Sequence, residues 1–336
     1  MSFTSTDILA LHSLEIGYTS GRSGNVLLPP LTATAKAGEL IAVIGRNGIG
    51  KSTLLRTLAG LQPSLGGDIY VKGKNLRKYS KLELAQEVGY ISTEIVKVSK
   101  MTVYELVALG RFPHTNWIGT IDKENRNIIL DSLSKTNMSG FTDRFISELS
   151  DGERQRAMIA RILAQDTGIM VMDEPLAFLD ISSKYEILHL MQQLSLTESK
   201  TIIFSTHELN MAINQSDKIW LINNNCLVEG APEDLMIAGI FDNLFDSPSV
   251  KFNSESGTFS FRSAEMKSIY LEGEGTHRHW TEKAINRAGY SVSTLKSIPY
   301  IIVPPGLNSK WKLVTNESSR DFSTLYDLVN DLGKII

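Results

Sequence analysis

A glycine-rich octapeptide ending in lysine and serine has the spacing of a phosphate-binding loop. It spans Gly45 to Ser52 (GRNGIGKS), follows the apolar stretch 40–44 and precedes an amphipathic stretch at 54–59. A strand, a glycine-rich loop and a helix in that order can cradle a polyphosphate, because the glycines let several backbone N–H groups point at one anion. Lys51 would contact the β- and γ-phosphates, and the Ser52 hydroxyl would ligate Mg²⁺. The segment therefore predicts a site for a nucleoside triphosphate.

Two carboxylates at the end of an apolar stretch could act on that triphosphate. Asp173 and Glu174 directly follow residues 169–172, which have the pattern of a buried strand. Ligand sites in open α/β sheets lie at the carboxyl ends of the strands. Asp173 would hold Mg²⁺ through water, and Glu174 would polarise or orient the attacking water. His207 follows another apolar strand, 201–204, where it could reach the γ-phosphate, although a lone histidine is more often structural.

Residues 149–155 (LSDGERQ) predict the start of a helix that runs to about residue 163. Ser150 is a suitable N-cap, and Glu153 three residues later completes a capping box. Taken alone, this segment is as consistent with a well-capped helix as with a ligand site.

Length and composition describe an ordinary globular chain with more than one domain. The 336 residues exceed the about 250–300 at which single cores stop growing, so a large domain with a smaller one is expected. The net charge of −3 offers no basic face for nucleic acid. One cysteine, Cys226, excludes an internal disulfide and fits a reducing compartment. We expect no signal peptide, and no stretch approaches the about 18 uninterrupted apolar residues of a membrane span.

Apolar strands that alternate with helices predict an α/β fold, with a mainly parallel sheet covered on both faces. Strands are expected at 8–18, 40–44, 69–71, 88–91, 169–172 and 201–204, with an edge-like segment or loop at 27–31. Helices are expected at 79–87, 183–194 and 233–245. Residues 94–164 have a helical pattern and predict a subdomain within a main domain that spans residues 1–250.

A change of character after residue 250 predicts an accessory α+β domain over 251–336, with a polar linker at 253–257. Its expected strands lie at 258–262, 268–271, 300–303 and 311–314, and its expected helices at 281–288 and 322–332. The glycine-rich turn at 271–275 lacks the spacing of a dinucleotide-binding loop. His277 and His279 have no nearby cysteine or paired acids to complete a metal site. A regulatory or dimer-stabilising role is a hypothesis.

Together these segments resemble the nucleotide-binding subunits of ABC transporters over about residues 9–245. The octapeptide is similar to the Walker A loop of that family, 149–155 to its signature motif, 169–174 to Walker B, 176–180 to the D-loop and His207 to the switch histidine. The resemblance implies a P-loop NTPase core with an N-terminal antiparallel β part. It implies catalysis by Glu174 and His207 and Mg²⁺ binding by Ser52 and Asp173. It implies ATP contacts by Tyr18 (stacking on adenine), Gly45, Asn47, Gly48, Gly50, Lys51, Ser52, Thr53, Ser150, Gly152 and Asp180.

The family mechanism implies that two copies of the chain sandwich ATP head to tail. The Ser150 hydroxyl, the Gly152 N–H and the helix dipole of one copy then address the γ-phosphate held at Lys51 of the other. Binding closes the dimer and hydrolysis lets it reopen, so the isolated monomer is expected to be a poor ATPase. Integral membrane permease subunits are the other implied partners, with a periplasmic or surface solute-binding protein as an indirect one. The implied location is the cytoplasmic face of the inner membrane.

Two places depart from the family pattern. Thr93, followed by Glu94, stands where a glutamine usually follows the strand 88–91 and contacts Mg²⁺ and the transport partner. Thr93 could ligate the metal through its hydroxyl, or Glu94 could substitute as a harder oxygen donor. Asp151 and Glu153 stand where glycine and glutamine are commoner, and we expect little cost because side chains at a helix start can point outward.

The stretch from Met101 to Pro113 resembles ATPases of importers for ferric siderophores, haem and vitamin B12. Thr102 and Glu105 form a capping box ahead of a helix over 103–109. In that family the region builds the groove for a cytoplasmic coupling helix of the membrane subunit, although a generic amphipathic helix would show a similar pattern. The sequence does not name the cargo, because the cargo never touches this chain.

Two other functional classes remain open. A soluble ABC-type ATPase acting on nucleic acid or ribosomes commonly has two cassettes or a long coiled coil, whereas this sequence has one cassette, no sustained heptads and no basic stripe. A P-loop kinase with a small-molecule acceptor would have no use for His207 or for the segment 150–155. Salt-sensitive binding to nucleic acid would favour the first class, and phosphate transfer to a metabolite the second.

Overall fold

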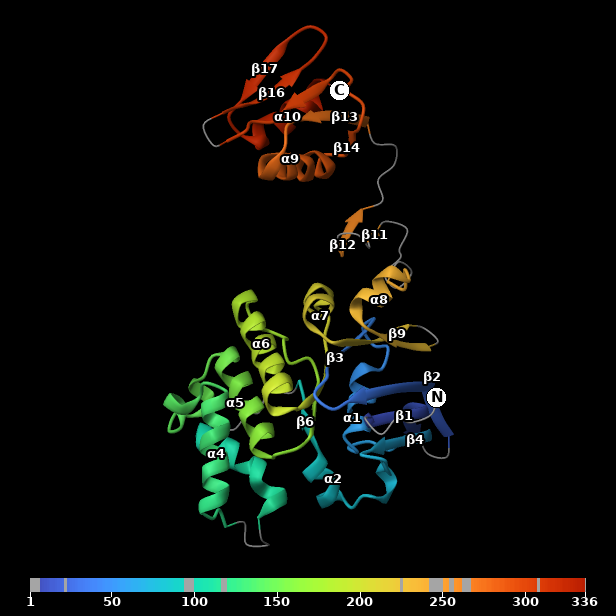
Figure 1. Cartoon of the computed structure of the whole chain (residues 1–336), viewed down its shortest axis with the longest axis vertical. Coiled ribbons are helices and arrows are strands. Elements are labelled where there is room, and N and C mark those ends of the chain that lie inside the picture. Colours follow the sequence, from blue (N-terminus) through green and yellow to red (C-terminus); the bar gives the residue numbers. More distant parts are fainter. Residues whose placement is uncertain are drawn as a thin grey trace. The chain divides into compact units, whose positions relative to one another are not determined.

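The chain divides into two compact units, with the division between residues 245 and 259. The computed structural model describes residues 7–20, 23–93, 100–115, 120–223, 226–241, 250–253, 257–261, 267–306 and 309–335. The first unit carries the phosphate-binding loop and the paired carboxylates, and the second carries the accessory segment (Figure 1). Among the helices of the described ranges, not one is both long and apolar enough to span a lipid bilayer.

A six-stranded sheet in the order β10-β9-β3-β8-β7-β6 forms the centre of the first unit. Its strands are β3 (Leu40–Gly45), β6 (Val88–Ile91), β7 (Ile169–Met172), β8 (Thr201–Ser205), β9 (Lys218–Asn223) and β10 (Cys226–Gly230). Neighbouring strands are parallel except for β10, which is antiparallel to β9. Every residue of β3, β7 and β8 is buried, which explains why these strands are continuous apolar runs in the sequence.

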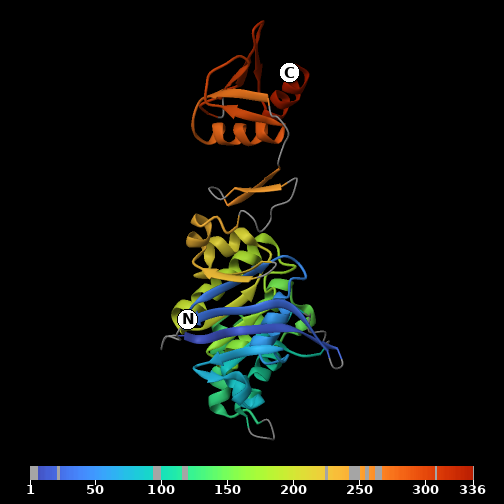
Figure 2. The ribbon, with the colours of Figure 1, turned by 90° about the vertical axis from the view of Figure 1, so that its right-hand side faces the viewer.

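An antiparallel sheet in the order β2-β1-β4-β5 accompanies the central sheet, and its long blue strands lie side by side in Figure 2. Its strands are β1 (Asp7–Ser20), β2 (Ser23–Lys36), β4 (Gly66–Val71) and β5 (Lys74–Asn75). The segment 27–31 is not a loop but part of the edge strand β2. Leu28 pairs with Ile16 and Leu31 with Leu14, and a register irregularity accommodates the two prolines between them.

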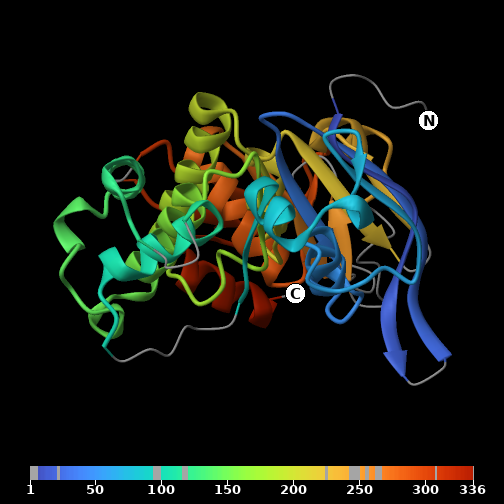
Figure 3. The same ribbon diagram turned by 90° about the horizontal axis from the view of Figure 1, so that it is seen from below.

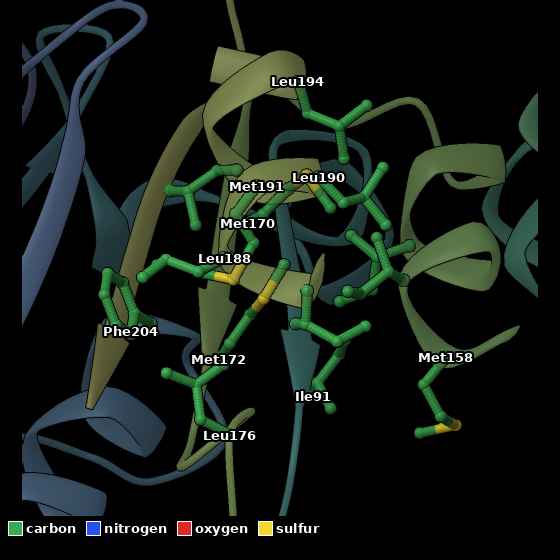
Figure 4. Close-up of a cluster of buried hydrophobic side chains, with 14 of the residues drawn as sticks. Ile91, Met158, Met170, Met172, Leu176, Leu188, Leu190, Met191, Leu194 and Phe204 are labelled. Carbon is green, nitrogen blue, oxygen red and sulfur yellow. The ribbon is translucent and has the colours of Figure 1, made fainter. Parts of the chain in front are cut away.

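Two hydrophobic cores cover the two faces of the central sheet, because successive side chains of a strand point to opposite faces. Ile41 and Val43 of β3 pack with α1 (Lys51–Leu58) and the antiparallel sheet. Ala42 and Ile44 belong to the other core, which includes α6 (Ile181–Glu198). Figure 4 shows that second core, where side chains from β6, β7, β8 and α6 converge.

The helical subdomain lies on the opposite side of the central sheet from β1, β2 and β4 (Figures 1 and 3). Its elements are α3 (Val103–Ala108), η2 (Leu109–His114), α4 (Lys123–Lys135), η3 (Ser139–Phe141), η4 (Ile146–Glu148) and α5 (Asp151–Ala164). The capping box predicted at Thr102 and Glu105 is present at the start of α3. Much of the subdomain shares the core that α6 covers, so it packs directly on the sheet that carries the carboxylates.

The remaining helices of the first unit are η1 (Leu76–Lys78), α2 (Lys81–Glu87), α7 (Leu209–Gln215) and α8 (Pro232–Ile237). The helix predicted over 233–245 ends at Ile237 and is wrong for residues 238–241, whereas 242–245 lie outside the described residues. Gly239 follows the C-cap with a φ of 66°, and the N–H groups of Gly239 and Ile240 bond back to Met236 and Leu235. This left-handed glycine ends the helix because it turns the chain away from the axis.

The second unit is built on a five-stranded sheet in the order β14-β13-β15-β16-β17. Its elements are β13 (Lys267–Glu272), α9 (Gly275–Arg287), β14 (Tyr290–Ser293), β15 (Tyr300–Ile302), β16 (Trp311–Val314), β17 (Ser319–Phe322) and α10 (Leu325–Ile335), and the short pair β11 (Val250–Asn253) and β12 (Thr258–Phe261) precedes them in the chain. The expected helix at 281–288 starts earlier, at Gly275, and the strands β14 and β17 were not predicted. Both are four residues long and rich in polar residues, so their sequences carry little of the apolar signal on which a strand prediction depends.

Candidate functional site

The phosphate-binding loop leaves β3 at Gly45 and enters α1 at Lys51, as the sequence predicts. Gly48 and Gly50 have φ angles of 75° and 111°, in the left-handed region that favours glycine. A Cβ at Gly48 would meet nothing within 4 Å, so the backbone there borders open space. The loop can therefore bring main-chain N–H groups close to an anion without a side chain in between.

Lys51 is buried inside this loop. Its Nζ donates to the carbonyl oxygens of Gly45 at 2.8 Å and Arg46 at 3.3 Å, and 6% of the residue is exposed. Burial lowers the pKa of the Lys51 ammonium below its ordinary value, and the nearby carboxylates of Glu174 and Asp173 oppose that shift. An anion bound in the loop would therefore interact with the Lys51 ammonium, which its surroundings solvate only weakly.

Asp173 lies beside the loop at the carboxyl end of β7 and is 2% exposed. Its Oδ1 accepts hydrogen bonds from the Ser52 hydroxyl at 3.1 Å and from the Ser205 hydroxyl at 2.7 Å. Three oxygens from three separate elements therefore meet beside Lys51. Hard oxygen donors of this kind are the ligands that Mg²⁺ prefers.

Glu174 and His207 form a side-chain pair next to these oxygens. Nε2 of His207 lies 2.7 Å from Oε1 of Glu174, and both side chains are partly exposed to solvent. The backbone N–H of Glu174 donates to the Ser205 hydroxyl at 2.8 Å. Glu174 has a φ of 48°, which is unusual for a residue with a side chain and indicates a conformation imposed by its surroundings.

A cavity of about 500 Å³ joins the loop, the glutamate–histidine pair and an aromatic side chain. It is lined by Tyr18, Leu27, Asn47, Gly48, Gly50, Lys51, Ser52, Thr53, Glu174 and His207. The Tyr18 hydroxyl lies 3.0 Å from Oγ1 of Thr53, while 52% of the tyrosine is exposed. The cavity thus combines a half-exposed aromatic ring with the anion-binding groups of the loop, and this combination suits a nucleotide.

Four predicted ATP contacts, Gly45, Ser150, Gly152 and Asp180, are not among the residues that line this cavity. Gly45 nevertheless belongs to the loop, where its carbonyl oxygen accepts from Lys51. Ser150 caps α5, and its backbone N–H donates to Glu153 at 2.8 Å. This bond lowers the pKa of the Glu153 carboxyl. Asp180 caps α6 by accepting from the N–H of Ser183 at 2.8 Å.

Thr93 lines a second cavity, of about 270 Å³, which it shares with Ser92, Gln155, Asp173 and Glu174, among others. Thr93 therefore lies near the paired carboxylates but outside the wall of the Lys51 cavity. Glu94, the other candidate at this departure, falls outside the described residues.

The segment Met101–Pro113 is fixed to α5 by a close backbone approach and a buried arginine. A Cβ at Gly110 would lie 2.1 Å from the Arg161 carbonyl oxygen, so only glycine fits. Arg111, 5% exposed, donates from Nε to Oδ1 of Asn125 at 2.6 Å and from Nη1 to the Ala164 carbonyl at 2.8 Å. Burial lowers the pKa of Arg111. Leu109 and Phe112 on either side remain exposed.

Sequence reasoning missed Ser205 and gave Arg111 no role. Ser205 ends the apolar strand β8, and its sequence signal is a single hydroxyl residue two positions before His207. Arg111 offered a clearer signal, because a charged residue follows Gly110 inside an apolar helical stretch. Neither signal says which distant groups the side chain meets.

Comparisons with known proteins identify the family of this chain. The family model described as ABC transporter matches residues 28–177. The iron(3+)-hydroxamate import ATP-binding protein FhuC of Bacillus subtilis is 34% identical over 238 residues, which are 70% of this chain and 87% of FhuC. The chain belongs to the ABC transporter ATP-binding proteins. This ABC ATPase therefore binds and hydrolyses ATP, as the resemblance of its motifs implied.

Further matches cover both units of the ABC ATPase. Residues 266–333 match the family described as iron ABC transporter C-terminal domain. The petrobactin import ATP-binding protein FpuC of Bacillus anthracis is 38% identical over 62% of this chain and 78% of its own. An ABC transporter structure described as metal-chelate type and inward-facing matches with a TM-score of 0.63 and 25% identity, over 76% of this chain and 96% of that one. The predicted P-loop α/β fold with a small C-terminal domain is confirmed.

Proposed function

We propose that this ABC ATPase drives the import of a metal chelate, with a ferric siderophore as the first candidate and haem or vitamin B12 as related ones. The observation that carries the proposal is the pairing, in one chain, of a nucleotide-sized cavity with a C-terminal segment that matches the iron ABC transporter domain. The relatives named for petrobactin and iron(3+)-hydroxamate import support the same cargo class.

ATP would enter the cavity with its adenine on Tyr18 and its phosphates in the loop from Gly45 to Thr53. The exposed ring of Tyr18 is held by its bond to Thr53, close to the point where the loop becomes helix α1. The β- and γ-phosphates would replace the carbonyl oxygens of Gly45 and Arg46 as the hydrogen-bond acceptors of the Lys51 ammonium. That exchange is favourable because a charged acceptor binds an ammonium more strongly than a neutral carbonyl does.

The residues present fit Mg²⁺ as the companion of ATP. Ser52 and Asp173 hold two oxygen donors 3.1 Å apart, and Asp173 is buried, so its carboxylate is weakly solvated and available to a cation or to its bound water. When bound, Mg²⁺ would neutralise charge on the phosphate oxygens. Thr93 would approach the same region from the second cavity, beside Asp173 and Glu174.

Glu174 would act as the catalytic carboxylate and His207 as its partner at the γ-phosphate. Their 2.7 Å contact lets the imidazole orient the carboxylate, which then accepts the proton of the attacking water. Water, carboxylate and γ-phosphate must be close together for this step. Because Glu174 lines the same cavity as Lys51, one nucleotide can meet both residues.

A second copy of the chain would complete the site. Ser150 is the N-cap of the 14-residue helix α5, with a capping box to Glu153, but it lies outside the cavity wall of its own chain. Ser150 and Gly152 would therefore reach the γ-phosphate held by another copy, with Asp180 at the same interface. The accessory unit, 251–336, would stabilise or regulate that dimer.

Permease subunits in the inner membrane would bind next to η2. Leu109 and Phe112 are 52% and 71% exposed, although the segment between them is anchored through Gly110 and Arg111. A rigid segment with apolar side chains directed outward suits an amphipathic helix of a membrane partner. The ABC ATPase would then act as a peripheral subunit on the cytoplasmic face, with a solute-binding protein as an indirect partner and no nucleic acid.

The test is purification from membranes with the co-eluting integral protein, followed by ATPase assays in lipid vesicles. Solute-binding protein loaded with a ferric siderophore should stimulate turnover, whereas stimulation by nucleic acid without any membrane protein would refute the proposal. Glu174→Gln should abolish turnover and keep bound Mg²⁺-ATP between two copies. Glu198→Gln is a matched control, since the two glutamates are 31% and 29% exposed and Glu198 pairs with Lys135, away from the cavity.

A further inference from the structure

The geometry points to Ser205 as a positioning residue that sets both the catalytic carboxylate and the metal-binding one. Ser205 is fully buried at the end of β8. Strands β7 and β8 are parallel neighbours, with Met172 opposite Phe204. The residues that follow Met172 and Phe204 are Asp173 and Ser205, so these two residues lie side by side at the carboxyl edge of the sheet.

One hydroxyl group serves two residues here. The Ser205 oxygen accepts from the Glu174 N–H at 2.8 Å and donates to Oδ1 of Asp173 at 2.7 Å. An N–H group cannot accept and an ionised carboxylate cannot donate, so the single hydroxyl proton has to lie toward Asp173. A side chain that only donates or only accepts could not make both bonds.

The bond to the backbone of Glu174 matters because the chain leaves the sheet at this point. Asp173 still pairs with β6, through its N–H and the Ile91 carbonyl at 2.9 Å, but Glu174 turns into the left-handed region with a φ of 48°. After this turn, the Glu174 N–H donates its hydrogen bond to the Ser205 hydroxyl. The same conformation directs the carboxylate of Glu174 to His207, two residues beyond Ser205.

Residues 205 and 207 thus hold Glu174 at both ends, the first at its amide and the second at its carboxylate. The bond to Asp173 leaves the second oxygen of that carboxylate for metal or water, since both the Ser52 and the Ser205 hydroxyls bond to Oδ1. Ser205 would therefore affect the Mg²⁺-dependent chemical step while leaving the nucleotide cradle unchanged. This inference rests on the proposed catalytic role of Glu174.

The experiment measures ATP hydrolysis by the full chain with its membrane partners as a function of ATP and Mg²⁺ concentration. Ser205→Ala should lower kcat about 10- to 100-fold, change KM for ATP less than about threefold and shift the Mg²⁺ dependence to higher concentration. ATP binding in EDTA should stay within about twofold of wild type, because the Lys51 ammonium is held by the carbonyl oxygens of Gly45 and Arg46 and not by Ser205.

Two further variants separate positioning from packing. Ser195→Ala is the matched control, because Ser195 is 3% exposed and its hydroxyl donates to the Gly38 carbonyl at 2.5 Å, away from the cavity. It should lose stability but keep kcat. Ser205→Thr keeps the hydroxyl, so its kcat should exceed that of Ser205→Ala about fivefold or more. Equal losses in the alanine and threonine variants, or a kcat for Ser205→Ala equal to that of Ser195→Ala, would overturn the inference.

A double-mutant cycle tests whether Ser205 acts through Glu174. In a Glu174→Gln background at saturating Mg²⁺, Ser205→Ala should lower the residual single-turnover rate by a clearly smaller factor than in wild type, because one of the two carboxylates that it positions is already lost and only its effect through Asp173 remains. The same factor of loss in both backgrounds would contradict the inference. Wild-type turnover in Glu174→Gln alone would instead refute the catalytic role of Glu174, so the two failures are distinguishable.

Discussion

Replacing Gly110 by alanine would place a methyl group against the backbone of a neighbouring helix. The new Cβ would lie 2.1 Å from the Arg161 carbonyl oxygen and 3.1 Å from the Gln165 nitrogen, both on the α5 side of the contact. These are backbone atoms, which cannot swing aside as a side chain could. Restoring a normal contact needs about 1 Å of added separation between η2 and α5.

The cost of that separation follows from the contacts it would break. Overpacking alone costs about 1–3 kcal/mol. Arg111 is the next residue, and its bonds to Asn125 and to the Ala164 carbonyl would be stretched. A hydrogen bond from a charged donor is worth about 1.5–3 kcal/mol. We therefore expect Gly110→Ala to lower the free energy of local opening of η2 by about 3–6 kcal/mol.

Hydrogen exchange is the suitable assay, because the loss should be local. Amide hydrogen exchange in α3 and η2 should become about 10²- to 10⁴-fold faster, while the amides of β3 and α1 keep their protection. ATP binding should persist, since the residues that line the Lys51 cavity belong to other elements. Transport should fail, because the exposed side chains of Leu109 and Phe112 would lose their fixed position.

Gly140→Ala is the matched control. A Cβ at Gly140 would meet nothing within 4 Å, so this variant should show wild-type exchange and transport. If Gly110→Ala matched Gly140→Ala in both measurements, the close approach of Gly110 to α5 would not be what holds η2 in place.

Three further predictions concern other parts of the chain. We expect Glu94→Ala to lower the ATPase rate more than Thr93→Ala, and near-wild-type rates in both would remove these residues from the metal site. The pKa of Glu153 is lowered by its bond from the Ser150 N–H, so the stability this bond adds is present above about pH 4.5 and is lost as the pH falls through the lower folded pKa. Thermal unfolding of Glu153→Gln should therefore converge with that of wild type at acidic pH, and a constant difference would contradict this. Truncation after Asn253 should leave ATP binding intact, and loss of binding would show that the main domain extends further.

Local patterns predicted those parts of the fold that depend on neighbours in the chain. The apolar runs at β3, β7 and β8, the glycine loop and the capping boxes at Thr102 and Ser150 are as expected, because each is set within a few residues. The short polar strands β14 and β17 were missed, since their pairing partners, not their own residues, make them strands. The segment 27–31 is part of β2 because it pairs with β1 despite its two prolines.

The sequence by itself determined the nucleotide chemistry of this protein. Lys51, Asp173, Glu174 and His207 were each predicted from a pattern next to an apolar strand. The structure brings Lys51, Glu174 and His207 to one cavity, with Asp173 bonded to Ser52 beside it. Tertiary structure alone decided what holds these groups in position. Ser205 meets Asp173 only because β7 and β8 are neighbours in the sheet, and hydrogen bonds between distant residues depend on a packing geometry that no local pattern encodes.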